Sequence, residues 1–130
     1  MQPEALEALA QIIGDGFSGS EITRLFARAG YSSIVHDGTT KWRFVVEQFQ
    51  QLQRRDGSAN GVLKVVQTAG SPQGWIGRRE SYEAFLGGVN QVLEFYALKL
   101  QDDGTLVKTG VTARTIARTK SVDEIEFDAR

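Results

Sequence analysis

The stretch RRESYEAFLGGVNQVLEFYALKL, residues 78–100, decides the fold. Its apolar residues recur every three or four positions, the spacing that places side chains on one face of an α-helix. The positions are Tyr82, Phe85, Leu86, Val89, Val92, Leu93, Tyr96 and Leu100. No other segment keeps this period for so long, so we predict a long helix over residues 78–100 at the centre of a helical domain.

Four shorter helices are predicted on the N-terminal side of this segment. Their approximate ranges are residues 3–13, 18–29, 39–55 and 58–69. Pro3 suits a first helical turn, and Ser18 precedes Glu21 by the three positions of a capping box. The candidate N-caps of the third and fourth helices are Asp37 or Thr39 and Asp56 or Ser58, respectively.

Each of these four segments carries an apolar stripe at helical spacing. In chain order the stripes are Leu6, Leu9, Ala10 and Ile13; Ile22, Leu25, Phe26 and Ala29; Trp42, Val45, Val46, Phe49 and Leu52; and Val62, Val65, Val66 and Ala69. Stripes of this width belong to amphipathic helices that share one core. The helix after Ser18 is therefore expected to act mainly as a packing element.

The C-terminal part of the chain has a different pattern. QDDG (residues 101–104) is a turn signal and TLVK (residues 105–108) is strand-like. In residues 112–120, small residues alternate with Thr112, Arg114, Ile116, Arg118 and Lys120. The fold predicted is mainly α, with about five helices around a long central helix and a short C-terminal β-hairpin or arm. We divide it into a helical domain, residues 1–108, and a C-terminal hairpin, arm or linker, residues 109–130.

Composition narrows the classes of function. The chain has 130 residues and no cysteine, so it fits a single domain without disulfides or thiolate metal sites. With one histidine it has no imidazole metal cage of its own, and we expect neither metal nor cofactor. It has no apolar run of the roughly 20 residues that a membrane helix needs. Glu4 and Glu7 argue against a signal peptide, so we expect a cytoplasmic protein without a membrane partner.

His36 and Asp37 are adjacent in a polar loop. An imidazole beside a carboxylate is a possible acid–base pair, and a small hydrolase would use it. The same pair is typical of a solvated turn, and the adjacent carboxylates Asp102 and Asp103 also resemble turn residues. We therefore expect no enzyme activity, and we keep His36 as a candidate binding residue.

Trp75 is an aromatic residue that falls outside the predicted helix faces. It lies in the loop SPQGWIG, residues 71–77, just before Arg78 and Arg79. Two arginines at a helix N-terminus oppose the helix dipole, so their position needs another explanation. Trp75 either covers the edge of the core or anchors a partner. Trp75, Arg78, Arg79 and His36 are the candidate residues for ligand or partner binding.

Nucleic-acid binding is the alternative function. Residues 41–64 hold five basic and two acidic residues, although the whole chain has a net charge of -1, which disfavours binding by phosphate neutralisation. In a winged-helix arrangement, residues 39–55 would be the recognition helix and the basic hairpin the wing. The residues expected to contact nucleic acid are Lys41, Arg43, Arg54, Arg55, Lys108, Arg114, Arg118 and Lys120. The connection over residues 30–38 is longer than the three or four residues usual in a helix-turn-helix.

Four segments carry a resemblance to a known group of proteins. They are SGSEITRLFARAG (residues 18–30), TKW (residues 40–42), GVLKVVQTA (residues 61–69) and RRESYEAFLGGVNQVLEFYALKLQDDGTL (residues 78–106). Over residues 17–107 the chain resembles the N-terminal region of the Ymh-type conserved hypothetical proteins of bacteria, and it is similar to abortive-infection AbiJ-type N-terminal domains.

The resemblance implies a helical sensor or recruiter of phage defence, placed before an RNA-cleaving, HEPN-like effector domain. The shared segments are helix patterns punctuated by glycine, so no catalytic residue carries over. We expect a non-enzymatic sensor or interaction module. Its partner would be a protein or a HEPN-like effector domain, fused or separate.

Overall fold

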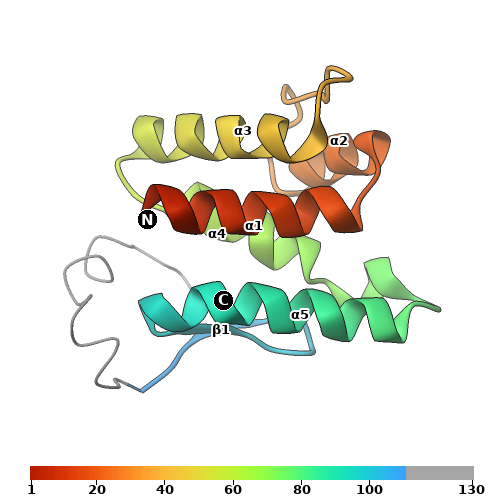
Figure 1. Ribbon diagram of the computed structural model, residues 1–130, viewed down its shortest axis with the longest axis vertical. Coiled ribbons are helices and arrows are strands. Elements are labelled where there is room, and N and C mark those ends of the chain that lie inside the picture. Colours follow the sequence, from red (N-terminus) through yellow and green to blue (C-terminus); the bar gives the residue numbers. More distant parts are fainter. Residues whose placement is uncertain (111–130) are drawn as a thin grey trace.

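The computed structural model describes residues 1–110, which form one predominantly helical unit with a short hairpin (Figure 1). The elements are α1 (Pro3–Gly16), α2 (Gly19–Arg28), α3 (Lys41–Asp56), α4 (Asn60–Ala69), the 3-10 helix η1 (Pro72–Trp75), α5 (Arg79–Leu93), the 3-10 helix η2 (Glu94–Tyr96), β1 (Leu98–Leu100) and β2 (Leu106–Lys108). The predicted fold class is confirmed. The basic positions Arg114, Arg118 and Lys120 lie outside the described residues, as does most of the predicted arm.

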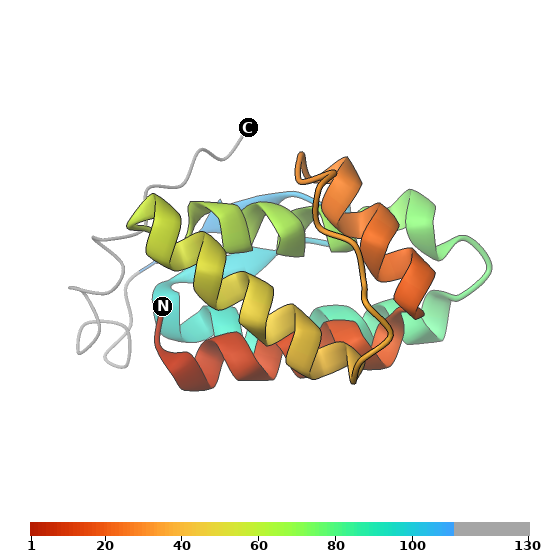
Figure 2. The ribbon, with the colours of Figure 1, turned by 90° about the horizontal axis from the view of Figure 1, so that it is seen from above.

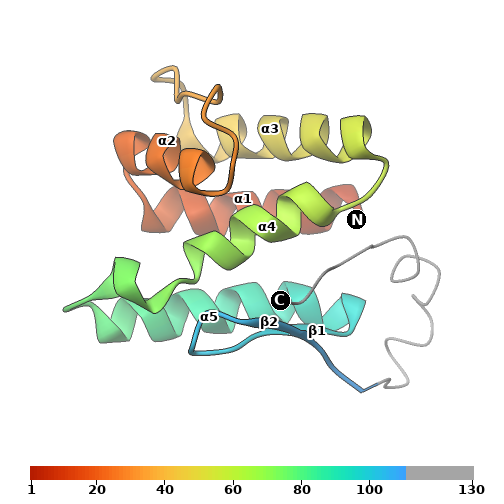
Figure 3. The same ribbon diagram turned by 180° about the vertical axis from the view of Figure 1, so that it is seen from behind.

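Three long helices are stacked, with α1 between α3 and α5 (Figure 1). Viewed from above, α2 and α4 lie on one side of the molecule and α1 and α5 on the other, while α3 crosses over both (Figure 2). The hairpin packs on α5, so α5 lies between α1 and the hairpin (Figure 3). This arrangement leaves the ends of α1 and α5 side by side at both ends of the molecule.

The capping box at the start of α2 is present as predicted. The Glu21 amide donates to the Ser18 hydroxyl at 3.2 Å, and the Ser18 amide donates to the Glu21 carboxylate at 2.8 Å. This backbone hydrogen bond is the main cause of a lowered pKa of Glu21. The caps predicted for α3 and α4 are wrong: their N-caps are Thr40 and Ala59, without side-chain capping bonds.

The predicted apolar stripes form the core. The stripes of α1, α2 and α4 are buried throughout, while in α3 Phe44 joins the core and Trp42 and Val46 are partly buried. Gly14 allows α1 and α3 to approach closely, because a Cβ there would lie only 3.0 Å from the backbone nitrogen of Trp42. The core therefore depends on this glycine as well as on the apolar residues.

The long helix predicted over residues 78–100 is too long. The helix α5 ends at Leu93 and is followed directly by η2. The chain then turns at Ala97, whose φ of 57° is left-handed. Residues Leu98–Leu100 are instead a strand, paired antiparallel with Leu106–Lys108. The side chain of Asn90 holds this strand against α5, because it donates to the Leu100 carbonyl at 2.9 Å and accepts from the Leu100 amide at 2.7 Å.

The hairpin of the described chain covers residues 98–108, and its first strand falls within the segment predicted as helix. Leu98 and Leu100 are buried and Lys99 is exposed, the alternation of a strand with one covered face. Leu93, Tyr96 and Leu100 also fit a helical period, which is why the sequence pattern favoured a helix there. No helix in residues 1–110 is both long enough and apolar enough to cross a membrane.

Candidate functional site

The sequence candidates around η1 come together where the chain turns into α5. We call Trp75, Ile76, Arg78 and Arg79 the Trp75 corner. The turn is closed by the Arg78 amide, which donates to the Trp75 carbonyl at 2.9 Å. Gly77 has a φ of 80°, a left-handed conformation that favours glycine and lets the chain enter α5 directly after η1.

Trp75 is buried, not exposed as a partner anchor would be. Only 4% of its surface is accessible, and its indole nitrogen donates to the Ala69 carbonyl at 2.9 Å. Its ring centroid lies 5.5 Å from that of Phe17, 5.7 Å from that of Tyr82 and 5.0 Å from that of Phe85. Of the two roles considered for this tryptophan, covering the edge of the core is the one that the geometry fits.

Arg78 is held against the outer face of this tryptophan. Its guanidinium carbon lies 4.7 Å from the centroid of the indole ring, and its Nη2 donates to the Gly74 carbonyl at 3.0 Å. The negative face of the aromatic ring attracts the cation. This contact is a local reason for a positive charge at the start of α5.

Arg79 takes part in a surface ion pair. Its Nε lies 3.2 Å from Glu83 Oε2, one helical turn along α5, and both side chains are largely exposed. Such pairs contribute little to stability, typically below about 1 kcal/mol. The guanidinium of Arg79 therefore remains accessible at the surface.

Ile76 is the most exposed large hydrophobic residue of residues 1–110. Its side chain is 82% accessible, and Val35, at 60%, is the other large exposed one in this part of the chain. Burying an isoleucine side chain gains about 1.5–3 kcal/mol, so its exposure here forgoes that stabilisation. It stands next to the buried Trp75 and is followed two and three positions later by Arg78 and Arg79.

A shallow cavity of about 390 Å³ opens beside the Trp75 corner, between the end of α1 and the start of α5. Its lining residues are Ile12, Asp15, Gly16, Trp75, Arg78, Ser81, Ala84 and Phe85. The walls are mainly apolar, with the carboxylate of Asp15 and the guanidinium of Arg78 at the surface. The corner thus combines an apolar projection with an adjacent apolar hollow.

His36 lies in a different environment. Its amide donates to the hydroxyl of Thr23 at 2.9 Å, and its Nε2 lies 2.9 Å from the Thr39 carbonyl oxygen. Its ring packs edge-on to Phe44 at 5.1 Å, and a Cβ on Gly19 would lie 2.6 Å from its Nδ1. The imidazole is thus wedged between the start of α2 and the start of α3.

Asp37 does not orient this imidazole. Its Oδ1 accepts from the Thr39 hydroxyl at 2.6 Å and from the Thr39 amide at 3.0 Å, which closes a turn. The Thr39 hydroxyl is the main cause of a lowered pKa of the Asp37 carboxyl. The carboxylate and the imidazole therefore both contact Thr39, the arrangement of a structured turn.

The basic residues of the nucleic-acid alternative are spread over several elements. Lys41 Nζ donates to the Phe17 carbonyl at 3.0 Å, and so ties α3 to the α1–α2 joint. Arg43 lies over the Trp42 ring at 5.4 Å, at the other end of α3 from Arg54. Arg54 follows Arg43 by eleven positions of helix, or roughly 16 Å along the axis.

The remaining members of this basic set lie elsewhere. Arg55 contacts the Asp56 carboxylate at 3.2 Å and lies over the Tyr31 ring at 5.8 Å. Lys108 is an exposed residue at the end of β2. The connection between α2 and α3 covers residues 29–40, which confirms that it is longer than a helix-turn-helix turn. Nucleic-acid binding stays a prediction.

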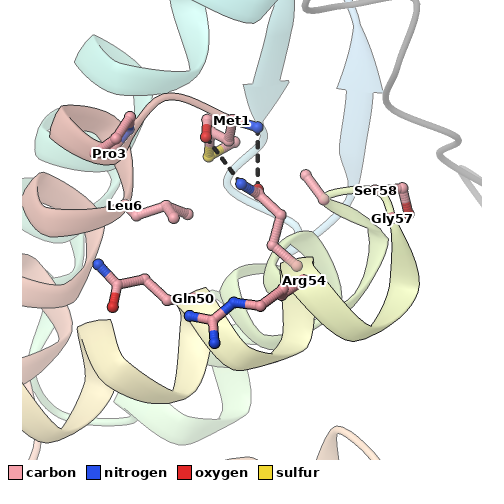
Figure 4. Close-up of a pocket in the computed structure, with 9 residues that line it drawn as sticks. Met1, Pro3, Leu6, Gln50, Arg54, Gly57 and Ser58 are labelled. Atoms are coloured by element: carbon pink, nitrogen blue, oxygen red, sulfur yellow. Dashed lines mark hydrogen bonds between the residues drawn. The ribbon is translucent and has the colours of Figure 1, made fainter.

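Two further hollows were not predicted from the sequence. One, of about 640 Å³, lies between the start of α1 and the end of α3, where Gln53 exchanges two hydrogen bonds with the backbone of Met1 (Figure 4). The other, of about 580 Å³, is a groove between α1 and α5 that we call the α1–α5 groove. It is lined by Gln2, Glu4, Ala5, Ala8, Gln91, Val92, Phe95 and Tyr96. Both form where two helices meet, so periodicity within one helix does not reveal them.

Within residues 1–110, no group of three or more His, Cys, Asp or Glu side chains is placed to hold a metal ion. Comparison with protein-family models, with curated proteins and with solved structures gave no significant match. The function proposed below therefore depends on the geometry of the described residues and on the resemblance of residues 17–107.

Proposed function

We propose that this protein is a non-enzymatic interaction module that binds a partner protein through the Trp75 corner. Following the resemblance of residues 17–107, we place it in bacterial phage defence of the abortive-infection type, as a sensor or recruiter. The observation that carries the binding site is Ile76, an isoleucine that is 82% exposed on a firmly anchored turn.

The anchoring of the turn supports this proposal. The indole of Trp75 is fixed by its bond to Ala69 and by three neighbouring aromatic rings, and the Arg78 guanidinium is fixed on its outer face. Because the turn is already ordered, little conformational entropy remains to be lost when a partner binds Ile76. Arginine is also one of the residues that are enriched at protein interfaces and among the residues that supply most of their affinity.

The chemistry of the corner indicates the kind of partner. Ile76 would enter an apolar pocket, while Arg78 and Arg79 would face carboxylates on the rim of that pocket. The partner proposed is therefore a protein surface with an apolar depression and an acidic edge. A HEPN-like effector domain, fused or separate, is the partner that the resemblance favours.

Site-directed photo-crosslinking in the bacterium that encodes the protein tests this proposal. A photoreactive amino acid replaces Ile76 in one variant and Val35 in another, since Val35 is the matched exposed hydrophobic residue. We expect one discrete adduct from position 76 and none from position 35. Adding Arg78→Glu and Arg79→Glu should remove the adduct. Equal adducts from both positions, or none from position 76, would overturn the binding site.

A further inference from the structure

We propose that residues 111–120 of the same chain dock in the α1–α5 groove and so tie the C-terminal segment to the helical domain. This site is separate from the Trp75 corner, and the inference does not depend on the function proposed above. It rests on the place where the described chain ends, on the lining of the groove, and on the charges of the two parts.

The described chain ends beside the groove. The Thr109 amide donates to the Ala97 carbonyl at 2.8 Å, one residue beyond the last pair of the hairpin. Ala97 directly follows Phe95 and Tyr96, which line the groove. Figure 1 shows the start of α1 and the end of α5 on the same side of the molecule, which is also where β2 ends. The described chain therefore ends close to two residues that line the groove.

The lining of the groove suits a narrow apolar occupant. Ala5 and Ala8 are small residues about one turn apart on α1, and the opposite wall of the groove is formed by Val92 at the end of α5 and Phe95 in η2. The Gln2 amide donates to the hydroxyl of the buried Tyr96 at 2.9 Å, which ties the start of α1 to η2. Residues 111–120 carry the apolar side chains of Val111 and Ile116 among small residues.

The charges of the two parts are complementary. Helix α1 has Glu4, Glu7 and Asp15 and no lysine or arginine, and Glu4 lines the groove itself. Residues 111–120 have the opposite character, with Arg114, Arg118 and Lys120 and no acidic residue. An acidic helix beside the groove attracts this segment, and it does not favour the acidic stretch that follows at residues 123–128.

Length and tethering also favour this occupant. The groove extends along α1 from about Gln2 to Ala8, roughly 9 Å of helix, whereas ten extended residues reach up to about 33 Å. A segment joined by a short linker acts at an effective concentration in the millimolar range. Modest apolar and ionic contacts are then enough to hold residues 111–120 in place.

Disulfide trapping in the full chain tests the inference, because the chain has no cysteine of its own. Ala8→Cys and Gln91→Cys each place a thiol on one wall of the groove, and each is combined with Ile116→Cys. The control pair is Gln51→Cys with Ile116→Cys, since Gln51 is exposed on α3. Circular dichroism checks that each variant keeps its helical content.

We expect both groove pairs to form an intramolecular disulfide at least tenfold faster than the control pair. Glu4→Lys with Glu7→Lys should slow the groove pairs severalfold and leave the control pair unchanged. Equal rates for all three pairs would overturn the inference. A disulfide between two molecules would overturn it as well, because the groove would then belong to a second copy of the chain.

Discussion

The Trp75 corner and the His36 loop, residues 31–40, are two connections that lead into helices, and they are held in opposite ways. Each exposes one large hydrophobic residue, Ile76 or Val35. The corner is held by the contacts of Trp75 with a buried aromatic cluster. The loop is held mainly by hydrogen bonds at the surface. Water competes with surface hydrogen bonds but not with buried ring contacts, so we infer that the corner opens less readily.

Removing the central aromatic ring of the corner is expected to have the largest effect. Trp75→Ala deletes a buried side chain that contacts three rings, and it leaves the Ala69 carbonyl without its indole donor. A loss of about 3–5 kcal/mol in the free energy of unfolding is expected from truncations of this kind. Chemical denaturation followed by circular dichroism measures it.

The matched change in the loop is His36→Ala. It should lower the free energy of unfolding by about 1 kcal/mol or less, because the imidazole is only half-buried. The comparison of the two regions fails if the two variants lose similar stability. Trp75→Phe separates the contributions within the corner, because it keeps a ring and removes the hydrogen bond to Ala69. Its cost should be about 1–3 kcal/mol.

Tyr82 links the corner to the turn of the hairpin and gives the corner a dependence on alkaline pH. Its hydroxyl donates to the Gly70 carbonyl at 2.7 Å and lies 3.2 Å from the Asp102 carbonyl oxygen, and burial raises its pKa above the usual value near 10. A raised pKa stabilises the fold below the pKa of the unfolded chain, and this contribution is lost as the pH rises through the folded pKa.

Tyr82→Phe should therefore cost about 1 kcal/mol at neutral pH. The difference between wild type and variant should shrink above pH 10 or so, in denaturation curves recorded at pH 7 and at alkaline pH. A constant difference across this range would show that Tyr82 ionises in the folded protein as it does in the unfolded chain.

Asp37 gives the His36 loop the opposite dependence on pH. The Thr39 hydroxyl lowers the pKa of the Asp37 carboxyl, so this contribution is present above the unfolded pKa and is lost as the pH falls through the folded value. Asp37→Asn should be slightly less stable than wild type at pH 7, and the difference should disappear as the pH falls below the lowered pKa of Asp37. A difference that grows in acid would contradict this assignment.

The two exposed hydrophobic residues should separate function from stability. Ile76→Asp and Val35→Asp each replace an exposed side chain, so each should change the free energy of unfolding by less than about 0.5 kcal/mol. Only Ile76→Asp should weaken binding to the partner captured by crosslinking, as measured by isothermal titration calorimetry. Weakening by both variants would extend the interface to the His36 loop.

The smallest change in signal is expected when the protein is mixed with nucleic acid. Fluorescence anisotropy with double-stranded DNA, single-stranded DNA and RNA, at about 50 and 200 mM salt, covers the range in which phosphate contacts appear. We expect no binding at either concentration. Binding with a log–log salt slope near −3 to −4 would instead support about three to five phosphate contacts, with Lys41 and Arg43 the first described residues to change.

Local patterns in the sequence determined the helices and most of the core. The Ser18 and Glu21 capping box and the stripes at Leu6 to Ile13 and Val62 to Ala69 are properties of neighbouring residues, so the chain specifies them without its tertiary partners. Trp75, Arg78 and Arg79 of the corner were candidates from the sequence, because a tryptophan close to two arginines is unusual in a polar loop. Ile76 was not among those candidates, since its exposure is known only from the structure.

Tertiary contacts determined the first strand of the hairpin, the burial of Trp75 and the α1–α5 groove. Residues 98–100 satisfy both a helical and an alternating pattern, and the bonds of Asn90 to Leu100 hold the strand. Burial of Trp75 depends on Phe17, between α1 and α2, and on Ala69, at the end of α4. With Trp75 buried, Ile76 is the exposed apolar residue of the corner. The α1–α5 groove exists only where two helices meet. These features depend on contacts between different elements. A periodic pattern within one element does not reveal such contacts.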